Sequence, residues 1–112
     1  MRNRPLIFVY RAISSKRYKN NIQNLIVDTD AVLKLNPVKF NWKSTGKAGV
    51  GLIAEDVNEI IPDLVIYNKE GMPESVRYDK VAIYLLEVVK ELKAGNDELQ
   101  KRVEVLEGEL QG

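Results

Sequence analysis

Apolar residues in the first two thirds of the chain occur in short runs, which predicts short elements. Residues 6–13 are apolar and β-prone and predict an extended strand. Residues 38–43 alternate strictly between apolar and polar side chains, which is the pattern of a half-buried strand. The apolar face of this second strand, and so a candidate part of the core, is formed by Val38, Phe40 and Trp42.

Two short helices are predicted, one on each side of the second strand. Apolar residues from Ile22 onward recur at mixed helical spacings until residues 36–37, Asn-Pro, end the helix. Asp28 or Asp30 is available as its N-cap. Residues 55–61 predict the second helix, which the following proline ends.

A hairpin and a loop complete the predicted body. Residues 64–67 and 75–78 are β-prone and flank a turn-rich stretch, which predicts a hairpin. Residues 44–51 contain three glycines, but their spacing fits neither phosphate-binding glycine motif, so a flexible loop is predicted there. The fold class is therefore α+β, with short elements and short connections.

The last third of the chain has a longer apolar period, that of a heptad repeat. The d positions are Leu85, Leu92, Leu99 and Leu106, and the a positions are Val89, Asn96, Val103 and Leu110. A helix capped by Asp79 and reaching about Leu110 would be roughly 45 Å long, at about 1.5 Å per residue. Because so small a body cannot cover it, the repeat predicts a coiled-coil helix over residues 81–112.

Side chains that flank the a and d positions favour parallel chains. In a parallel assembly Arg102 at a g position faces Glu107 at an e position of the neighbouring helix, and this pair sets orientation more than stability. Asn96 at an a position costs stability and fixes the register. Since the heptads are few and Gly95 interrupts them, they predict self-association without fixing the number of chains.

Length and charge narrow the classes of function. The 112 residues allow one modest domain with an appendage. The formal net charge of +1 argues against bulk attraction to nucleic acid, although residues 1–20 hold six bases and no acid. In a DNA-binding zipper the basic region directly precedes the heptads, whereas about 65 residues separate Lys19 from Leu85 here. The longest apolar runs are far shorter than the roughly 20 residues that span a bilayer. We therefore expect neither a nucleic-acid nor a membrane partner.

The chain has no cysteine and no histidine, so it lacks thiol nucleophiles and the commonest catalytic base and metal ligand. A serine can still be activated by a lysine that is partly desolvated or repelled by neighbouring cations. The stretch SSKRYKNNI, residues 14–22, contains both residue types, with two further cations close to Lys19. On a regular helix Lys19 would share a face with Ser15, whereas in a strand that turns into a loop it could fold back on Ser14. On residue types alone, a solvated basic loop is the commoner explanation.

Four blocks of sequence, in order, resemble one known family. They are SSKRYKNNI, LNPVKFNWK at 35–43, GLIAEDVNEIIPDLV at 51–65 and VRYDKVAIYLLEVVKEL at 76–92. Together they resemble the C-terminal intramolecular chaperone auto-processing domain of endosialidases and of phage tail spike or neck appendage proteins. The same self-cleaving serine and lysine peptidase module is found in the myelin regulatory transcription factor. Members of the family assemble as trimers, which suits the heptads.

The resemblance implies roles for individual residues. In the family pattern S-[SD]-x-R-x-K the first serine is the nucleophile and the last lysine is the general base. Ser14 and Lys19 would therefore form a catalytic dyad, with Arg17 as the intervening arginine. The second position is often aspartate and is Ser15 here, so an acid that could tune or orient the dyad is absent. Cleavage in the family falls just before the serine, which is the bond between Ile13 and Ser14 here.

The resemblance also implies a domain organisation and a setting. Residues 1–13 would be the tail end of a parent protein, residues 14–80 the chaperone and peptidase body, and residues 81–112 the coiled-coil helix. We expect a homotrimer that helps a phage tail fibre or spike-type protein to fold. It would then release itself as a single-turnover serine endopeptidase, without a cofactor or metal. Assembly would take place in the host cytoplasm, and the released fragment would be absent from the mature virion.

One alternative belongs to another class of protein. The chain would then be a non-cleaving trimerisation module that stays attached to its parent, with Ser14 and Lys19 as bystanders.

Overall fold

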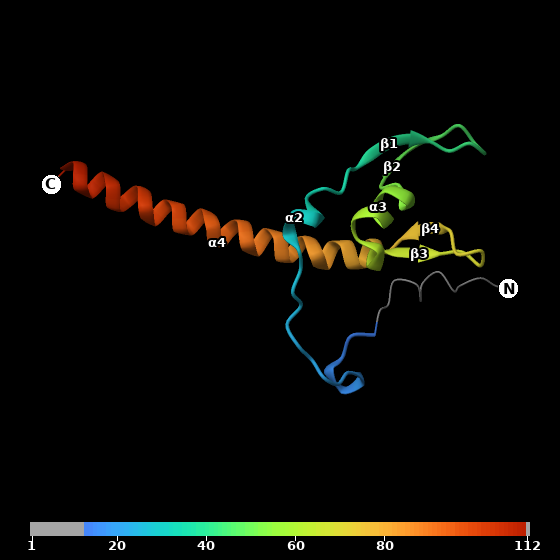
Figure 1. The fold of residues 1–112 in the computed structure, drawn as a ribbon, viewed down its shortest axis with the longest axis horizontal. Coiled ribbons are helices and arrows are strands. Elements are labelled where there is room, and N and C mark those ends of the chain that lie inside the picture. Colours follow the sequence, from blue (N-terminus) through green and yellow to red (C-terminus); the bar gives the residue numbers. More distant parts are fainter. Residues whose placement is uncertain (1–12, 112) are drawn as a thin grey trace.

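The computed structural model describes residues 13–111, and all its elements except the last are short. In chain order they are η1 (Lys16–Tyr18), α2 (Thr29–Val32), β1 (Val38–Asn41), β2 (Ala48–Gly51), α3 (Ala54–Ile60), η2 (Pro62–Leu64), β3 (Val65–Tyr67), β4 (Pro73–Val76) and α4 (Tyr78–Gln111), where η denotes a 3₁₀ helix. Figure 1 shows a small body gathered around the start of α4, which projects away from it. The predicted α+β class with a long C-terminal helix is confirmed. The strand expected at 6–13 lies, except for Ile13, outside the described residues.

The strands of the described chain form two separate antiparallel hairpins. The predicted hairpin is β3 with β4, and its pairing is irregular between Ile66 and Tyr67. The other hairpin pairs β1 with β2, so the prediction of a loop over residues 44–51 is wrong in its second half. Two of the three glycines that favoured a loop, Gly49 and Gly51, are instead required by close packing. A side chain at Gly51 would lie 2.8 Å from the hydroxyl of Tyr78.

The core of the body lies where α3, η2 and the second hairpin meet the first turns of α4. Leu64 is completely buried, and Val57, Val65 and Val81 are buried around it. Half-buried residues surround this cluster: Leu35, Leu52, Ile61, Val76 and Tyr84. α3 confirms the helix predicted before Pro62, and its acidic first turn suits the positive end of the helix dipole.

α2 follows the N-terminal stretch in the chain and packs against α4. Asp28 is the N-cap used, since its Oδ1 accepts a hydrogen bond from the Ala31 N–H at 3.1 Å. Val32 of α2 and Val88 of α4 are both buried, and the two helices are in contact. The predicted helix is therefore present but shorter than its apolar pattern indicates, because residues 22–27 are not helical.

α4 has 34 residues, which corresponds to about 50 Å at 1.5 Å per residue. It begins at Tyr78, so Asp79 lies in its first turn and not at the expected N-cap position. The body packs on the flank of α4 that carries Val81, Tyr84 and Val88, which are c and g positions of the heptads. No helix within residues 13–111 has the length and apolar character needed to cross a membrane.

Candidate functional site

The stretch that contains the serines and lysines is shaped by a single 3₁₀ turn, η1. Ser15 is its N-cap. The Ser15 Oγ accepts hydrogen bonds from the backbone N–H of Arg17 at 3.3 Å and from its guanidinium at 3.2 Å. Backbone hydrogen bonds of 3.1 Å from Tyr18 and Lys19 close the turn, and the chain leaves it in an extended conformation. Ser15 and Arg17 therefore hold the turn together.

This turn brings Ser14 and Lys19 into contact. Lys19 Nζ donates a hydrogen bond to Ser14 Oγ at 3.0 Å, within the roughly 2.6–3.2 Å reach that a general base needs. The expectation from helical spacing, that Lys19 would meet Ser15, is wrong. A three-residue 3₁₀ helix followed by an extended residue does not provide the i, i+4 neighbours of an α-helix.

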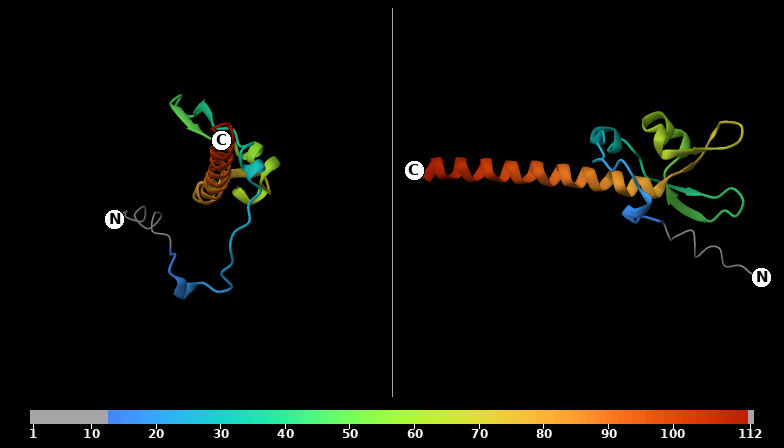
Figure 2. Two further views of the ribbon diagram at one scale, coloured as in Figure 1. Left: turned by 90° about the vertical axis from the view of Figure 1, so that its left-hand side faces the viewer. Right: turned by 90° about the horizontal axis from the view of Figure 1, so that it is seen from below.

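The pair is open to solvent in the single chain. Ser14 and Lys19 are both exposed, and Ile13, which supplies the preceding carbonyl, is 75% exposed. Within the described chain, the side-chain hydrogen bonds of residues 14–19 are made inside that stretch. In Figures 1 and 2 this blue segment lies on the opposite side of α4 from the β1–β2 hairpin. The two groups are thus positioned by local structure and not by the core.

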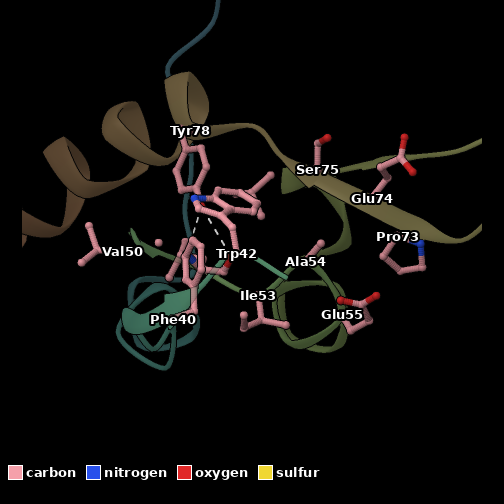
Figure 3. Close-up of a pocket in the computed structure, with 13 residues that line it drawn as sticks. Phe40, Trp42, Val50, Ile53, Ala54, Glu55, Pro73, Glu74, Ser75 and Tyr78 are labelled. Atoms are coloured by element: carbon pink, nitrogen blue, oxygen red, sulfur yellow. Dashed lines mark hydrogen bonds between the residues drawn. The ribbon is translucent and has the colours of Figure 1, made fainter. Parts of the chain in front are cut away.

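A separate cleft lies between the two hairpins and the start of α3. It has a volume of about 910 Å³ and is lined by aromatic rings that Figure 3 shows close together, Phe40, Trp42 and Tyr78. The rings of Phe40 and Trp42 meet edge to face, with centroids 4.9 Å apart. Trp42 is 56% exposed, so its assignment to the core is wrong, whereas Phe40 is half-buried. β1 ends one residue before Trp42, and the side chain lines the cleft where the hairpin leaves the body.

The heptad residues form a continuous exposed stripe along α4. All eight a and d residues are exposed in the single chain: Leu85, Val89, Leu92, Asn96, Leu99, Val103, Leu106 and Leu110. A stripe of this size on one face of a helix marks an interaction surface, since leaving it in water costs free energy. The body covers the c and g flank and leaves this stripe uncovered.

Two residues, Tyr78 and Leu33, make contacts that the sequence does not predict. The Tyr78 hydroxyl accepts a hydrogen bond from the Leu52 N–H at 2.9 Å and so ties the start of α4 to the loop before α3. Leu33 belongs to the apolar pattern of the first predicted helix, but it is 59% exposed and lies beside Leu92 and Leu99 of α4. No motif marks either role, because both depend on contacts between segments distant in sequence.

The fold and the site define a small α+β domain with a projecting helix and an exposed serine–lysine pair. Residues 14–66 match the family described as the chaperone of endosialidase. No curated protein is similar enough to the chain to count as a match. The family match confirms the resemblance of this chain to an intramolecular chaperone domain. It also supports a chaperone role that involves a parent precursor, and a peptidase-related auto-processing domain.

Proposed function

We propose that this domain is an intramolecular chaperone that releases itself by autoproteolysis, with Ser14 as nucleophile and Lys19 as general base. The observation that carries the proposal is the 3.0 Å contact between Lys19 Nζ and Ser14 Oγ. The family match supports it, because the matched segment begins at Ser14, the residue that cleavage would make the new N-terminus.

The proposed reaction uses only groups of this chain and water. The neutral amine of Lys19 accepts the hydroxyl proton as Ser14 Oγ bonds to the carbonyl carbon of Ile13. The tetrahedral oxyanion then collapses, the C–N bond breaks, and Lys19 returns the proton to the departing amine of Ser14. Water hydrolyses the resulting ester, leaving a carboxylate on Ile13 and a free hydroxyl on Ser14. Each chain reacts once, because the bond that is cut is its own.

Hydrogen-bond donors to the oxyanion are a further requirement, and losing one such donor typically slows a reaction by about 10²–10³. The exposure of Ser14 and Lys19 in the single chain is compatible with donors supplied by the assembled state. Cleavage would then depend on assembly, so that the chaperone domain is released only after the chains have assembled.

The exposed heptad stripe supports parallel self-association, and the family resemblance makes a homotrimer the working form. Residues 81–112 would align three chains, and the body would hold the ends of the parent chains, residues 1–13, in register. Cleavage would remove the element that aligned them, which leaves the parent assembly kinetically trapped. The parent would be a phage tail fibre or spike-type protein that assembles in the host cytoplasm, and the released fragment would be absent from the mature virion.

Mass spectrometry of the purified chain tests the reaction. We expect a fragment of residues 14–112 and its 1–13 partner, and we expect Ser14→Ala and Lys19→Ala to abolish both. Ser15→Ala and Lys16→Ala are matched controls, since each removes the same chemical group one or a few residues away and should leave the fragments detectable. Fragments that persist in Ser14→Ala or Lys19→Ala would refute the dyad.

The second candidate function is a non-cleaving trimerisation module. The observation in its favour is the exposure of Ser14 and Lys19, which lack the enclosure typical of a peptidase site. An intact mass of the chain attached to its parent sequence, under conditions in which sedimentation shows it to be fully assembled, would establish this alternative.

A further inference from the structure

A groove between α2 and α4 is open to solvent. It has a volume of about 470 Å³, with Leu33 on one wall and Leu92 and Leu99 on the other. Gly95 of α4 also lines the groove, and a side chain there would meet nothing within 4 Å. Leu33, the residue that directly follows α2, is 59% exposed, so the single chain leaves this wall uncovered.

The groove also has an acidic edge, formed by Asp30 of α2 and Glu91 of α4. The ion pairs found within residues 13–111 join Glu87 to Lys90 and Lys93 to Asp97, so neither of these two acids is paired there. An apolar groove with unpaired acids on its edge fits a partner that brings a cation together with aliphatic surface.

The heptads specify which residue of a neighbouring copy would reach this groove. Val88 and Gly95, which line it, are g positions, and in a parallel coiled coil the g flank of one helix lies against the e flank of the next. With the offset that pairs Arg102 with Glu107 of the neighbour, Val88 faces Lys93 of the neighbour. Lys93 is thereby placed over the groove and near its acidic edge.

Lys93 cannot make this contact within its own chain. It lies two residues from both Glu91 and Gly95, which on a helix is about 200° of rotation, so it lies on the opposite flank of α4. In the single chain it pairs with Asp97 at 2.9 Å, but both side chains are more than half exposed. Such an exposed pair contributes little stability and leaves Lys93 free to exchange partners.

We propose that the α2–α4 groove is a docking surface for a second copy of this chain, whose Lys93 lies against Asp30 and Glu91. The proposal rests on the parallel coiled coil of the proposed function and extends the interface from α4 to α2. Gly95 allows the neighbouring helix to approach closely, and Leu33 covers its aliphatic surface. α2 follows the stretch that contains Ser14 and Lys19. Docking would therefore hold the chain that leads from that stretch to α2 in place against α4, and so couple assembly to the site.

A charge exchange in the full chain tests the contact. Asp30→Lys and Lys93→Asp should each raise the concentration at which the chain assembles about fivefold, measured by sedimentation equilibrium. The double variant should return to within about twofold of the natural chain. Asp97→Ala is the matched control, since it removes only the pair within the helix and should change assembly less than Lys93→Asp. A double variant that is as weak as the sum of the single variants would overturn the proposal.

Cross-linking distinguishes the geometry, and the chain has no cysteine to interfere. Asp30→Cys combined with Lys93→Cys, treated with a short bismaleimide, should give covalent trimers, because each copy would be joined to the next around a closed ring. Asp30→Cys combined with Ala94→Cys, at the outward f position, is the control and should give few linked chains. Linked species that stop at dimers, links confined to one chain, or equal yields in both variants would each refute the docking surface.

The failure of this proposal is separable from the failure of the proposed function. Sedimentation of the natural chain determines whether a trimer exists, and mass spectrometry determines whether Ser14 is released. A trimer that cleaves but shows no coupling between residues 30 and 93 would remove the docking surface alone.

Discussion

The body and the projecting part of α4 use apolar residues in opposite ways. In the body, Leu64 and Val57 are almost completely buried within one chain. Along α4 beyond the body, Leu92 and Leu99 are residues of similar size but remain about 60% exposed. The hydrophobic effect therefore stabilises the body within a single chain, whereas the helix stripe gains no such stabilisation in the single chain. One chain thus contains a buried apolar core and a long apolar stripe that stays exposed.

The stretch that contains Ser14 and Lys19 lies outside both the core of the body and the heptad stripe. Its geometry comes from a capped turn and from hydrogen bonds between residues that are close in sequence and mostly exposed. Such contacts contribute little to the free energy of unfolding, and they are the kind that a parent chain or a neighbouring copy can readily rearrange. The three regions should therefore respond differently to substitution.

The largest effect on the stability of a single chain is expected in the core of the body. Leu64→Ala removes a completely buried side chain and should lower the free energy of unfolding by about 2–5 kcal/mol. Thermal or denaturant unfolding followed by Trp42 fluorescence, at concentrations too low for assembly, measures this loss.

Leu99→Ala is the matched comparison, because it makes the same change in a leucine that is 59% exposed. Under the same dilute conditions it should alter stability by less than about 0.5 kcal/mol, while at high concentration it should weaken assembly. Equal losses for the two variants in dilute solution would show that the stripe is already buried within one chain.

A smaller loss is expected where the β1–β2 hairpin meets α4. Gly51→Ala would place a methyl group 2.8 Å from the Tyr78 hydroxyl, which accepts the hydrogen bond of the Leu52 N–H. Displacing that hydroxyl should cost about 1–3 kcal/mol, as overpacking usually does. Gly46→Ala is not a suitable control, because Gly46 has a positive φ of 74°. Gly51→Ala combined with Tyr78→Phe is better, since part of the loss should disappear once the hydroxyl is removed.

The spacing of apolar residues predicted the helices and strands in which one face is consistently apolar. The long helix α4, the helix before Pro62 and the hairpin of β3 and β4 all have such patterns and are present. β2 could not be predicted in this way, because Gly49 and Gly51 carry no side chain that could show a strand period. The need for glycine arises from Phe40 on the paired strand and from Tyr78 at the start of α4.

The candidate site was predictable only in part, for a related reason. Sequence spacing on an assumed helix favoured Ser15 as the partner of Lys19, whereas the family pattern favoured Ser14. The contact observed is with Ser14, since the backbone takes a 3₁₀ turn and then extends. A short segment with few apolar residues has no period from which its backbone could be inferred, so its geometry depends on caps such as Ser15.

A substitution at Gly95 should raise the stability of α4 slightly. It distinguishes the effect of helix propensity from that of the α2–α4 groove. Gly95→Ala replaces an exposed helical glycine that has nothing within 4 Å of its would-be side chain, so helix formation should gain about 1 kcal/mol. Gly108→Ala is the matched control, because it is equally open and lies outside the α2–α4 groove. Circular dichroism of dilute protein should show similar gains in helix stability. In the assembled state Gly95→Ala should gain less than Gly108→Ala, because its methyl group would occupy the docking surface.

The smallest effect on stability, and the sharpest contrast with the body, is expected at Ser15. Ser15→Ala removes the cap that accepts the Arg17 hydrogen bonds, but Ser15 lies outside the core, so the unfolding midpoint of the body should not change. If the turn positions Lys19 against Ser14, losing about 1 kcal/mol of capping should slow release of residues 14–112 about fivefold. Ser15→Asp should restore the rate, since a carboxylate also caps the turn and binds the guanidinium more strongly. Time courses of fragment formation by mass spectrometry measure both variants. Unchanged rates in Ser15→Ala would mean that the assembled state, and not this turn, sets the contact between Ser14 and Lys19.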